Sequence, residues 1–105
     1  MEVNKYGFDN NGLLTLFEEK YNDIDVRFGT VTILSGERVP KKGLSKHEEN
    51  EYSIIIKGEI EGESGGTPFR VSESHATFIP AGEQHWAINS GEEPCKIVWA
   101  LVKEK

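Results

Sequence analysis

The sequence predicts an all-β fold for this chain of 105 residues. Eleven glycines and four prolines are spread along the whole length and mark frequent turns. Between the turns lie short runs rich in Val, Ile, Thr, Phe, Tyr and Trp, the residue types that favour strands. A mass of 11.8 kDa is that of one domain, so all of these strands must share one core.

The first 24 residues are predicted to form an arm and an edge element, and residues 25–105 the β-barrel domain, with a single domain overall. Residues 1–11 are mostly polar. The apolar run from Leu13 to Phe17 suits either one helical turn or a small edge strand, and the pattern alone leaves both open.

A long strand is predicted from Asp25, because apolar or β-branched residues recur at even positions as far as Leu34. Another strand covers residues 52–56, between the charged segment 46–51 and the turn at 57–59. Further strand-length segments follow at 60–63, 68–71, 76–79, 85–89 and 95–102, with turn sequences between them. This regular spacing of short strands indicates a barrel or a sandwich.

Charge and hydropathy exclude several classes of function. Twelve Lys and Arg against eighteen Asp and Glu give a net charge of −6. The basic residues are scattered, so we expect neither nucleic acid nor an anionic membrane surface as a partner. No apolar stretch approaches the roughly 20 residues of a membrane-spanning helix. Cys95 is the single cysteine and the amino end lacks the features of a signal peptide, so we expect a cytoplasmic location.

A first candidate for chemistry is the segment from His47 to Tyr52. On a helix His47 and Glu51 would share a face, but the Ser-Ile-Ile-Ile run that follows favours a strand. In a fully extended chain their α-carbons would lie about 13 Å apart, too far to serve one ion. A bend at residues 48–50 would end one strand at His47 and begin the next at Glu51, so that both point at one centre. Ser45 has the same parity as His47 and would face that centre as well.

A second candidate is the segment from Pro80 to Asn89. Pro80 and Gly82 form a turn that delivers His85 to the start of a strand. Ala87, the next residue on the same face, is small and leaves space beside the imidazole.

At these two segments the chain resembles the cupin family. His47, three residues, Glu51, six residues and Gly58 fit the first cupin motif, and Pro80, Gly82, His85 and Asn89 fit the second. The resemblance spans about residues 31–102. Ser45 stands where cupins usually carry the first histidine of a His-x-His pair, and Ser74-His75 stands where a Gly-Asp pair is common.

The resemblance implies a jelly-roll barrel, also called a double-stranded β-helix, with His47, Glu51 and His85 as metal ligands. Ser45 would be a weak or water-mediated fourth position. Such a donor set suits a divalent Fe, Mn, Ni, Zn, Co or Cu ion. The implied function is that of a metal-dependent enzyme on a small molecule, an oxygenase first and an isomerase or lyase second. The alternative is a non-catalytic module that binds a metal or a small ligand, since no general base beyond the ligands is evident and the catalytic residues stay unknown.

The remaining chemistry-bearing residues have plainer interpretations. The aromatic residues Tyr52, Phe69, Phe78, Trp86 and Trp99 are expected to fill the barrel or an interface. Lys46, Arg70, His75 and Lys96 are expected to face solvent, and Cys95 to be a small core residue. Residues 97–102 are apolar on both faces of one strand, although a barrel wall needs only one apolar face, so we expect a homodimer or a larger assembly.

Overall fold

The computed structural model describes residues 1–8 and 12–105, and within these ranges it contains nine strands and no helix. The strands are β1 (Leu13–Lys20), β2 (Ile24–Ile33), β3 (Arg38–Val39), β4 (Asn50–Lys57), β5 (Glu59–Ser64), β6 (Thr67–Ser72), β7 (Ala76–Ile79), β8 (His85–Ile88) and β9 (Cys95–Glu104). The predicted all-β class is confirmed. The run from Leu13, for which the sequence allowed a helical turn or a strand, is strand β1. Nothing in the described ranges has the length and hydropathy of a membrane-crossing helix.

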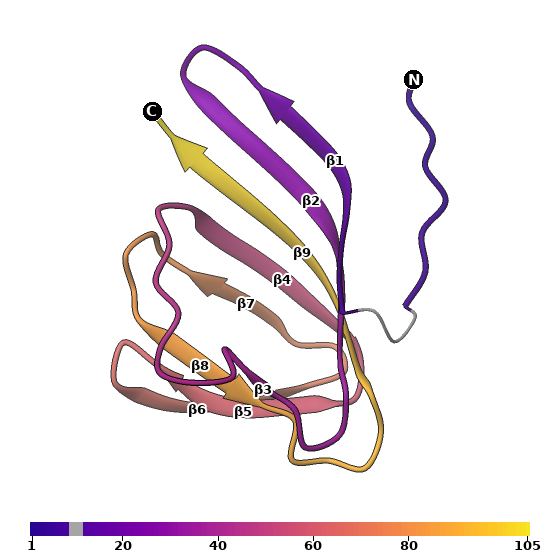
Figure 1. Ribbon diagram of the computed structural model, residues 1–105, viewed down its shortest axis with the longest axis vertical. Helices are drawn as coiled ribbons and strands as arrows, with labels where there is room; N and C mark the ends of the chain where they lie inside the picture. The colour runs from indigo at the N-terminus through magenta and orange to yellow at the C-terminus, as the bar shows by residue number, and fades with distance from the viewer. Residues whose placement is uncertain (9–11) are drawn as a thin grey trace.

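The described strands form two antiparallel sheets that face each other in a jelly roll (Figure 1). The larger sheet has the order β1-β2-β9-β4-β7, and the smaller sheet has the order β3-β8-β5-β6. Strand β9 lies in the middle of the larger sheet and pairs with β2 from Cys95–Ile33 to Glu104–Ile24. The carboxyl-terminal strand therefore lies between strands from the first half of the chain.

The core lies between the two sheets. Its buried side chains come from both, namely Ile33, Ile55, Ile60, Cys95 and Ile97. The inward-facing residues of β4 pair with those of β9 in successive layers: Glu51 with Leu101, Ser53 with Trp99, and Ile55 with Ile97. Because side chains alternate along a strand, these three pairs share the inner face. The layers therefore run from a polar end at Glu51 to an apolar end at Ile55 and Ile97.

A cavity of about 470 Å³ lies between the sheets and extends from the polar layer to the apolar layers. Its wall includes Ser45, Glu51 and His85, and its apolar part includes Ile55, Ile97 and Trp99. The fold thus places Ser45 and Glu51 of the first segment and His85 of the second around one cavity.

One local expectation was wrong. His47 was expected to end a strand, but only Ser45 makes a bridge, with His85, and residues 46–49 are irregular. Pro40 has no N–H for a strand ladder, and Gly43 has a φ of +70°, so the segment before Ser45 does not pair continuously. The predicted bend at residues 48 and 49 is present.

Candidate metal centre

Three side chains from three segments meet at the polar end of the barrel. His47 comes from the irregular segment before β4, Glu51 from β4, and His85 from the first position of β8. One nitrogen or oxygen atom from each lies within 4.8 Å of the others. The His47 Nε2 and Glu51 Oε1 atoms are 3.4 Å apart, and the two imidazole centroids are 5.2 Å apart. The structure therefore brings together the three residues that the sequence proposed for one centre.

Both imidazoles are oriented by main-chain carbonyls. His47 Nδ1 lies 3.0 Å from the Glu49 carbonyl oxygen, and His85 Nδ1 lies 3.0 Å from the Glu83 carbonyl oxygen. A carbonyl only accepts, so each Nδ1 carries the proton and donates it. In a neutral ring this leaves Nε2 with a free lone pair, the state that a metal ligand requires.

The His47 Nε2 atom is the structural test of whether the three residues fit a metal ion. It is buried and has no hydrogen-bond partner in the described part of the chain. Buried polar atoms of proteins are nearly always paired. A lone pair facing a carboxylate oxygen at 3.4 Å is unfavourable unless a proton or a cation lies between them. The donor set therefore fits a cation.

The two histidine-bearing segments also hold each other. The Gly82 N–H donates to the His47 carbonyl at 2.8 Å, and the Ala81 N–H donates to Asn50 Oδ1 at 2.9 Å. Gly82 has a φ of +83°, which glycine adopts without strain and which turns its N–H toward the other segment. The Pro80-Ala81-Gly82 turn thus positions His85 and braces His47 at once.

Ser45 lies on the wall of the same cavity as Glu51 and His85. Its N–H donates to the His85 carbonyl at 2.8 Å, and the His85 N–H donates to the Ser45 carbonyl at 3.0 Å. Main-chain pairing therefore fixes the position of Ser45 opposite His85.

Two ion pairs tie the segment that carries His47 to the larger sheet. Arg27 of β2 contacts Glu49 at 2.7 Å, and Lys103 of β9 contacts Glu48 at 2.8 Å. The hydrogen bond to Lys103 and the positive charge of its amino group lower the pKa of the Glu48 carboxyl. The same hydrogen bond and the negative charge of Glu48 raise the pKa of the Lys103 amino group. The sequence analysis missed both pairs, because nothing local in the chain indicates which strand lies beside residues 48 and 49.

Other residues singled out from the sequence lie outside the cluster. His75 is exposed, and its Nδ1 accepts the Ser72 N–H at 2.9 Å. Lys46 and Arg70 are exposed, and Lys96 lies 5.9 Å from the ring centroid of Phe8.

Cys95 and Asn89 have structural positions. Cys95 is fully buried, and burial, with the charge of Glu59, raises the pKa of its thiol to about 11. Asn89 is also fully buried, and its amide donates to the carbonyls of Ile33 and Glu93 at 2.8 Å each. This motif residue therefore joins the end of β2 to the loop before β9 and does not face the centre.

The aromatic residues divide between the interior and the outer surface. Trp99 is 5% exposed, and together with Phe69 and Trp86 it lines the cavity. Tyr52 and Phe78 are about half exposed, and their ring centroids lie 4.9 Å apart.

Comparison with known proteins agrees with this architecture. The family model described as "Cupin domain" matches residues 29–101. No curated protein sequence matches the chain significantly.

Solved structures share the fold at low sequence identity. The Cnp3 cupin domain of Schizosaccharomyces pombe superimposes with a TM-score of 0.72 at 19% identity, over 89% of this chain and 64% of that one. A Cupin 2 conserved barrel domain protein from Salinispora arenicola gives 0.70 at 20% identity, over 99% and 89%. A predicted oxalate decarboxylase from Thermotoga maritima gives 0.63 at 21% identity, over 78% and 81%. This chain spans less than two thirds of the Cnp3 structure, and at these identities the likeness concerns the fold alone.

Proposed function

We propose, since this chain belongs to the cupin family, that His47, Glu51 and His85 hold a divalent metal ion. The observation that carries the proposal is the buried, unpartnered Nε2 of His47 beside the Glu51 carboxylate. Two imidazoles and one carboxylate suit Fe, Mn, Co, Ni, Cu or Zn in the divalent state. The Ser45 hydroxyl or a water would occupy a further position.

We further propose that the chain is a metal-dependent enzyme acting on a small molecule, of oxygenase type first and of isomerase or lyase type second. A metal bound there would supply Lewis acidity or activate water or oxygen. The cavity of about 470 Å³ lies in the range of small-molecule sites. Its layers suit a ligand whose polar end meets Glu51 and whose apolar body lies toward Ile55 and Ile97.

A non-catalytic binding module is the second candidate. The observation that favours it concerns the two carboxylates on the cavity wall. Glu51 faces His47, and Glu83 Oε2 accepts a hydrogen bond from the Ser64 hydroxyl at 2.6 Å. With Glu51 held by the proposed metal ion and Glu83 by Ser64, neither carboxylate is left to act as a general base. Turnover of a candidate substrate that needs added Fe(II) would support the enzyme, whereas tight ligand binding that a chelator leaves unchanged would support the module.

The metal proposal is tested on protein purified without a histidine tag, by metal analysis and by thermal unfolding with added divalent ions. Metal at a hundredfold excess over its dissociation constant stabilises a native protein by about 2.7 kcal/mol. For a domain of this size that is a rise in Tm of about 10 to 20 °C. Alanine at His47, Glu51 or His85 should shrink this rise, and His75→Ala, which removes an exposed histidine, should leave it intact. An unchanged metal response in the triple alanine variant would place the site elsewhere.

We also propose that a second copy of the chain covers the outer face of the larger sheet. The strand register aligns one outward-facing residue from each strand in a single row: Phe17, Phe28, Ala100, Tyr52 and Phe78. The neighbouring row consists of Leu14, Thr30, Val98, Ile54 and Ala76. Neither row contains a charged residue, which is unusual for a sheet face in water.

The extent of this face supports a second copy as its occupant. Phe28, Tyr52, Ile54 and Phe78 are 38%, 49%, 47% and 53% exposed. With Leu14 they present on the order of 400 Å² of apolar surface, before the half-buried residues between them are counted. A stable interface buries about 800 Å² per partner. The described part of the amino-terminal arm contacts the larger sheet beside the exposed aromatic residues. The Thr30 hydroxyl donates to the Gly7 carbonyl at 3.1 Å, Asn4 Nδ2 donates to the Leu16 carbonyl at 2.7 Å, and Lys96 Nζ lies 5.9 Å from the Phe8 ring centroid.

We also propose a cytoplasmic location, and that the chain binds neither nucleic acid nor membranes. Cys95 is a free, buried thiol, which suits the reducing cytoplasm. The exclusion of nucleic acid and of membranes as partners rests on the net charge of −6. Cell fractionation tests the location, and binding assays at low salt test both partners.

A further inference from the structure

Glu49 contacts His47 with its main chain and strand β2 with its side chain. Its main-chain carbonyl accepts the Nδ1 proton of His47 at 3.0 Å, and its carboxylate pairs with Arg27 of β2 at 2.7 Å. The Glu49 side chain is only 18% exposed. The carbonyl that orients His47 is therefore attached, through the side chain of its own residue, to a strand of the larger sheet.

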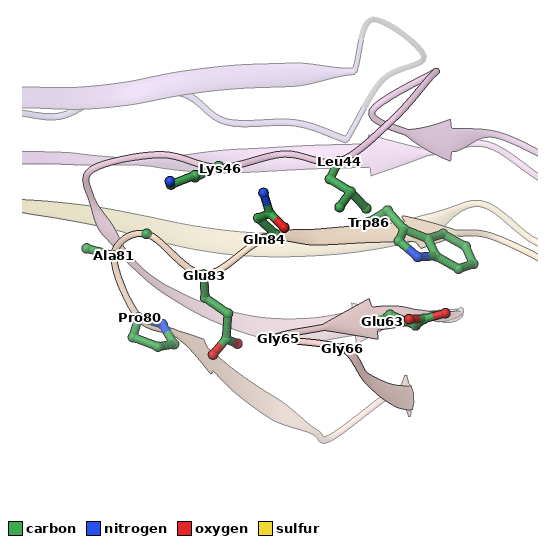
Figure 2. A pocket seen from close by; sticks show the side chains of 11 residues that line it. Leu44, Lys46, Glu63, Gly65, Gly66, Pro80, Ala81, Glu83, Gln84 and Trp86 are labelled. Carbon is green, nitrogen blue, oxygen red and sulfur yellow. The ribbon is translucent and has the colours of Figure 1, made fainter.

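Glu83 repeats this arrangement at the other histidine. Its carbonyl lies 3.0 Å from His85 Nδ1, and its carboxylate accepts the Ser64 hydroxyl of β5 at 2.6 Å. Figure 2 shows its side chain directed from the turn toward Gly65. A Cβ added at Gly65 would lie 3.0 Å from Glu83 Oε1, and the Gly65 N–H donates to the Gln84 carbonyl at 2.9 Å. The Glu83 carbonyl is thus anchored, through the carboxylate of the same residue, to the end of the β5–β6 hairpin in the smaller sheet.

We propose that Glu49 and Glu83 are positioning residues that set the metal affinity of the centre. Each aims one imidazole with its carbonyl and locks that carbonyl to the barrel wall with its carboxylate. The inference rests on the proposed metal-binding function and adds to it two residues that touch the ligands and not the ion. Groups that orient metal-bound histidines typically change metal affinity 10- to 100-fold when they are removed.

Glu48 provides a matched control within the same segment. It is adjacent to Glu49 and pairs with Lys103 at 2.8 Å, so it also ties this segment to the larger sheet. Its side chain is 78% exposed, and the His47 imidazole bonds to the carbonyl of Glu49 instead. If any ion pair between this segment and the larger sheet were sufficient to set the metal affinity, replacing Glu48 and replacing Glu49 would weaken metal binding equally.

The test compares Glu49→Ala, Glu83→Ala and Glu48→Ala by calorimetric titration with Zn(II) at constant pH, with unfolding of the metal-free proteins as the folding control. We expect affinity about 10- to 100-fold weaker in the first two variants and within about twofold of native in the third. Arg27→Met and Ser64→Ala remove the same anchors from the other side and should weaken binding in the same direction. Arg27→Lys keeps the positive charge and should therefore bind Zn(II) more tightly than Arg27→Met, although less tightly than the native chain. Native affinity in both Glu49→Ala and Glu83→Ala would overturn the inference.

A metal-free measurement separates this inference from the proposed function. Long-range ¹H–¹⁵N spectra of the imidazoles at pH 8 report which ring nitrogen carries the proton. We expect the Nδ1–H form at His47 and His85 in the native chain, and a mixture of forms at His47 in Glu49→Ala and at His85 in Glu83→Ala. If native protein binds no Zn(II), the proposed function fails, whatever the spectra show. If it binds Zn(II) but the variants keep the native tautomers, the positioning roles fail alone.

Discussion

Two histidines far apart in the sequence are held in the same ring form. Each donates from Nδ1 to the carbonyl of a glutamate two residues away, in the forward direction for His47 and in the backward direction for His85. The direction reverses because His47 lies before the bend at residues 48 and 49, whereas His85 lies after the turn at residues 80–82. In both cases the unprotonated Nε2 of the neutral ring is left for a ligand.

Ser45 offers a direct test of the geometry around these histidines. Its main chain is paired with His85 in both directions, so a side-chain change should leave the backbone in place. A neutral hydroxyl is a poor ligand and an imidazole a good one. Ser45→His should therefore bind Zn(II) or Ni(II) about tenfold tighter or better, equivalent to about 1.4 kcal/mol, while any activity falls because an open position is closed.

The control for this substitution is Lys46→His, at the neighbouring exposed position. It should leave metal affinity unchanged. A folded Ser45→His variant with native or weaker affinity in calorimetric titration would show that Ser45 does not face the metal.

Cys95 should be chemically inert in the native state. Burial raises the pKa of its thiol to about 11, from 9.0 for an ordinary thiol. At pH 9 the thiolate fraction then falls from about one half to about one hundredth, so alkylation should be roughly 50-fold slower than in the unfolded chain. Because the native pKa is raised, the thiol contributes stability below pH 9 that is lost as the pH rises toward 11.

Iodoacetamide kinetics with and without denaturant measure this difference. Equal rates in the two states at pH 9 would contradict the burial of Cys95.

Among the elements, strands β5 and β8 approach each other closely beside the centre. Gly62 of β5 pairs with Ala87 of β8, and the pair Ser64–His85 lies two residues further along. A Cβ at Gly62 would collide with the Trp86 carbonyl oxygen and lie 2.9 Å from the Ala87 Cα. Both obstacles are main-chain atoms, so the strands themselves would have to separate.

Gly62→Ala should therefore destabilise the chain by about 1 to 3 kcal/mol, the usual cost of overpacking. It should also weaken metal binding, because His85 begins strand β8. Denaturant unfolding and calorimetric titration measure the two effects. Gly7→Ala is the control, since a Cβ there meets no atom within 4 Å. Native stability in Gly62→Ala would mean that the two strands lie further apart than described.

For the whole molecule, the apolar outer face predicts the state of assembly. Light scattering at micromolar concentration should give twice the chain mass of 11.8 kDa. A lysine in the middle of the face, as in Tyr52→Lys or Ile54→Lys, would bury an unpaired charge in the interface and should give the single-chain mass.

Leu44→Lys is the control for the dimer, because Leu44 is 52% exposed and lies in the irregular segment before Ser45, outside the larger sheet. It should leave the mass unchanged. A native chain that stays a single-chain particle on concentration would overturn the second copy as the occupant of this face.

The sequence by itself indicated most of the strands and, through the family resemblance of its two motifs, the three candidate ligands. Alternation and turn residues are local properties, so β2, β4 and the later strands were predicted to within a few residues. The spacing of His47, Glu51 and His85 is also local within each motif, and the fold brings the two motifs together. The proposed ligand set therefore followed from the resemblance of two local motifs to those of a known family, before any tertiary contact was known.

Only the tertiary structure decided the remaining features, because they depend on contacts between distant segments. Leu13–Lys20 is a strand since it pairs with β2, which its short apolar run could not indicate. His47 lies in a bend and not in a strand, because its segment meets β8 at Ser45 alone. The pairs Arg27–Glu49 and Ser64–Glu83 join residues 22 and 19 positions apart. No local pattern encodes which side chains meet across a barrel, so the anchors of the two histidines became visible only when the chain was folded.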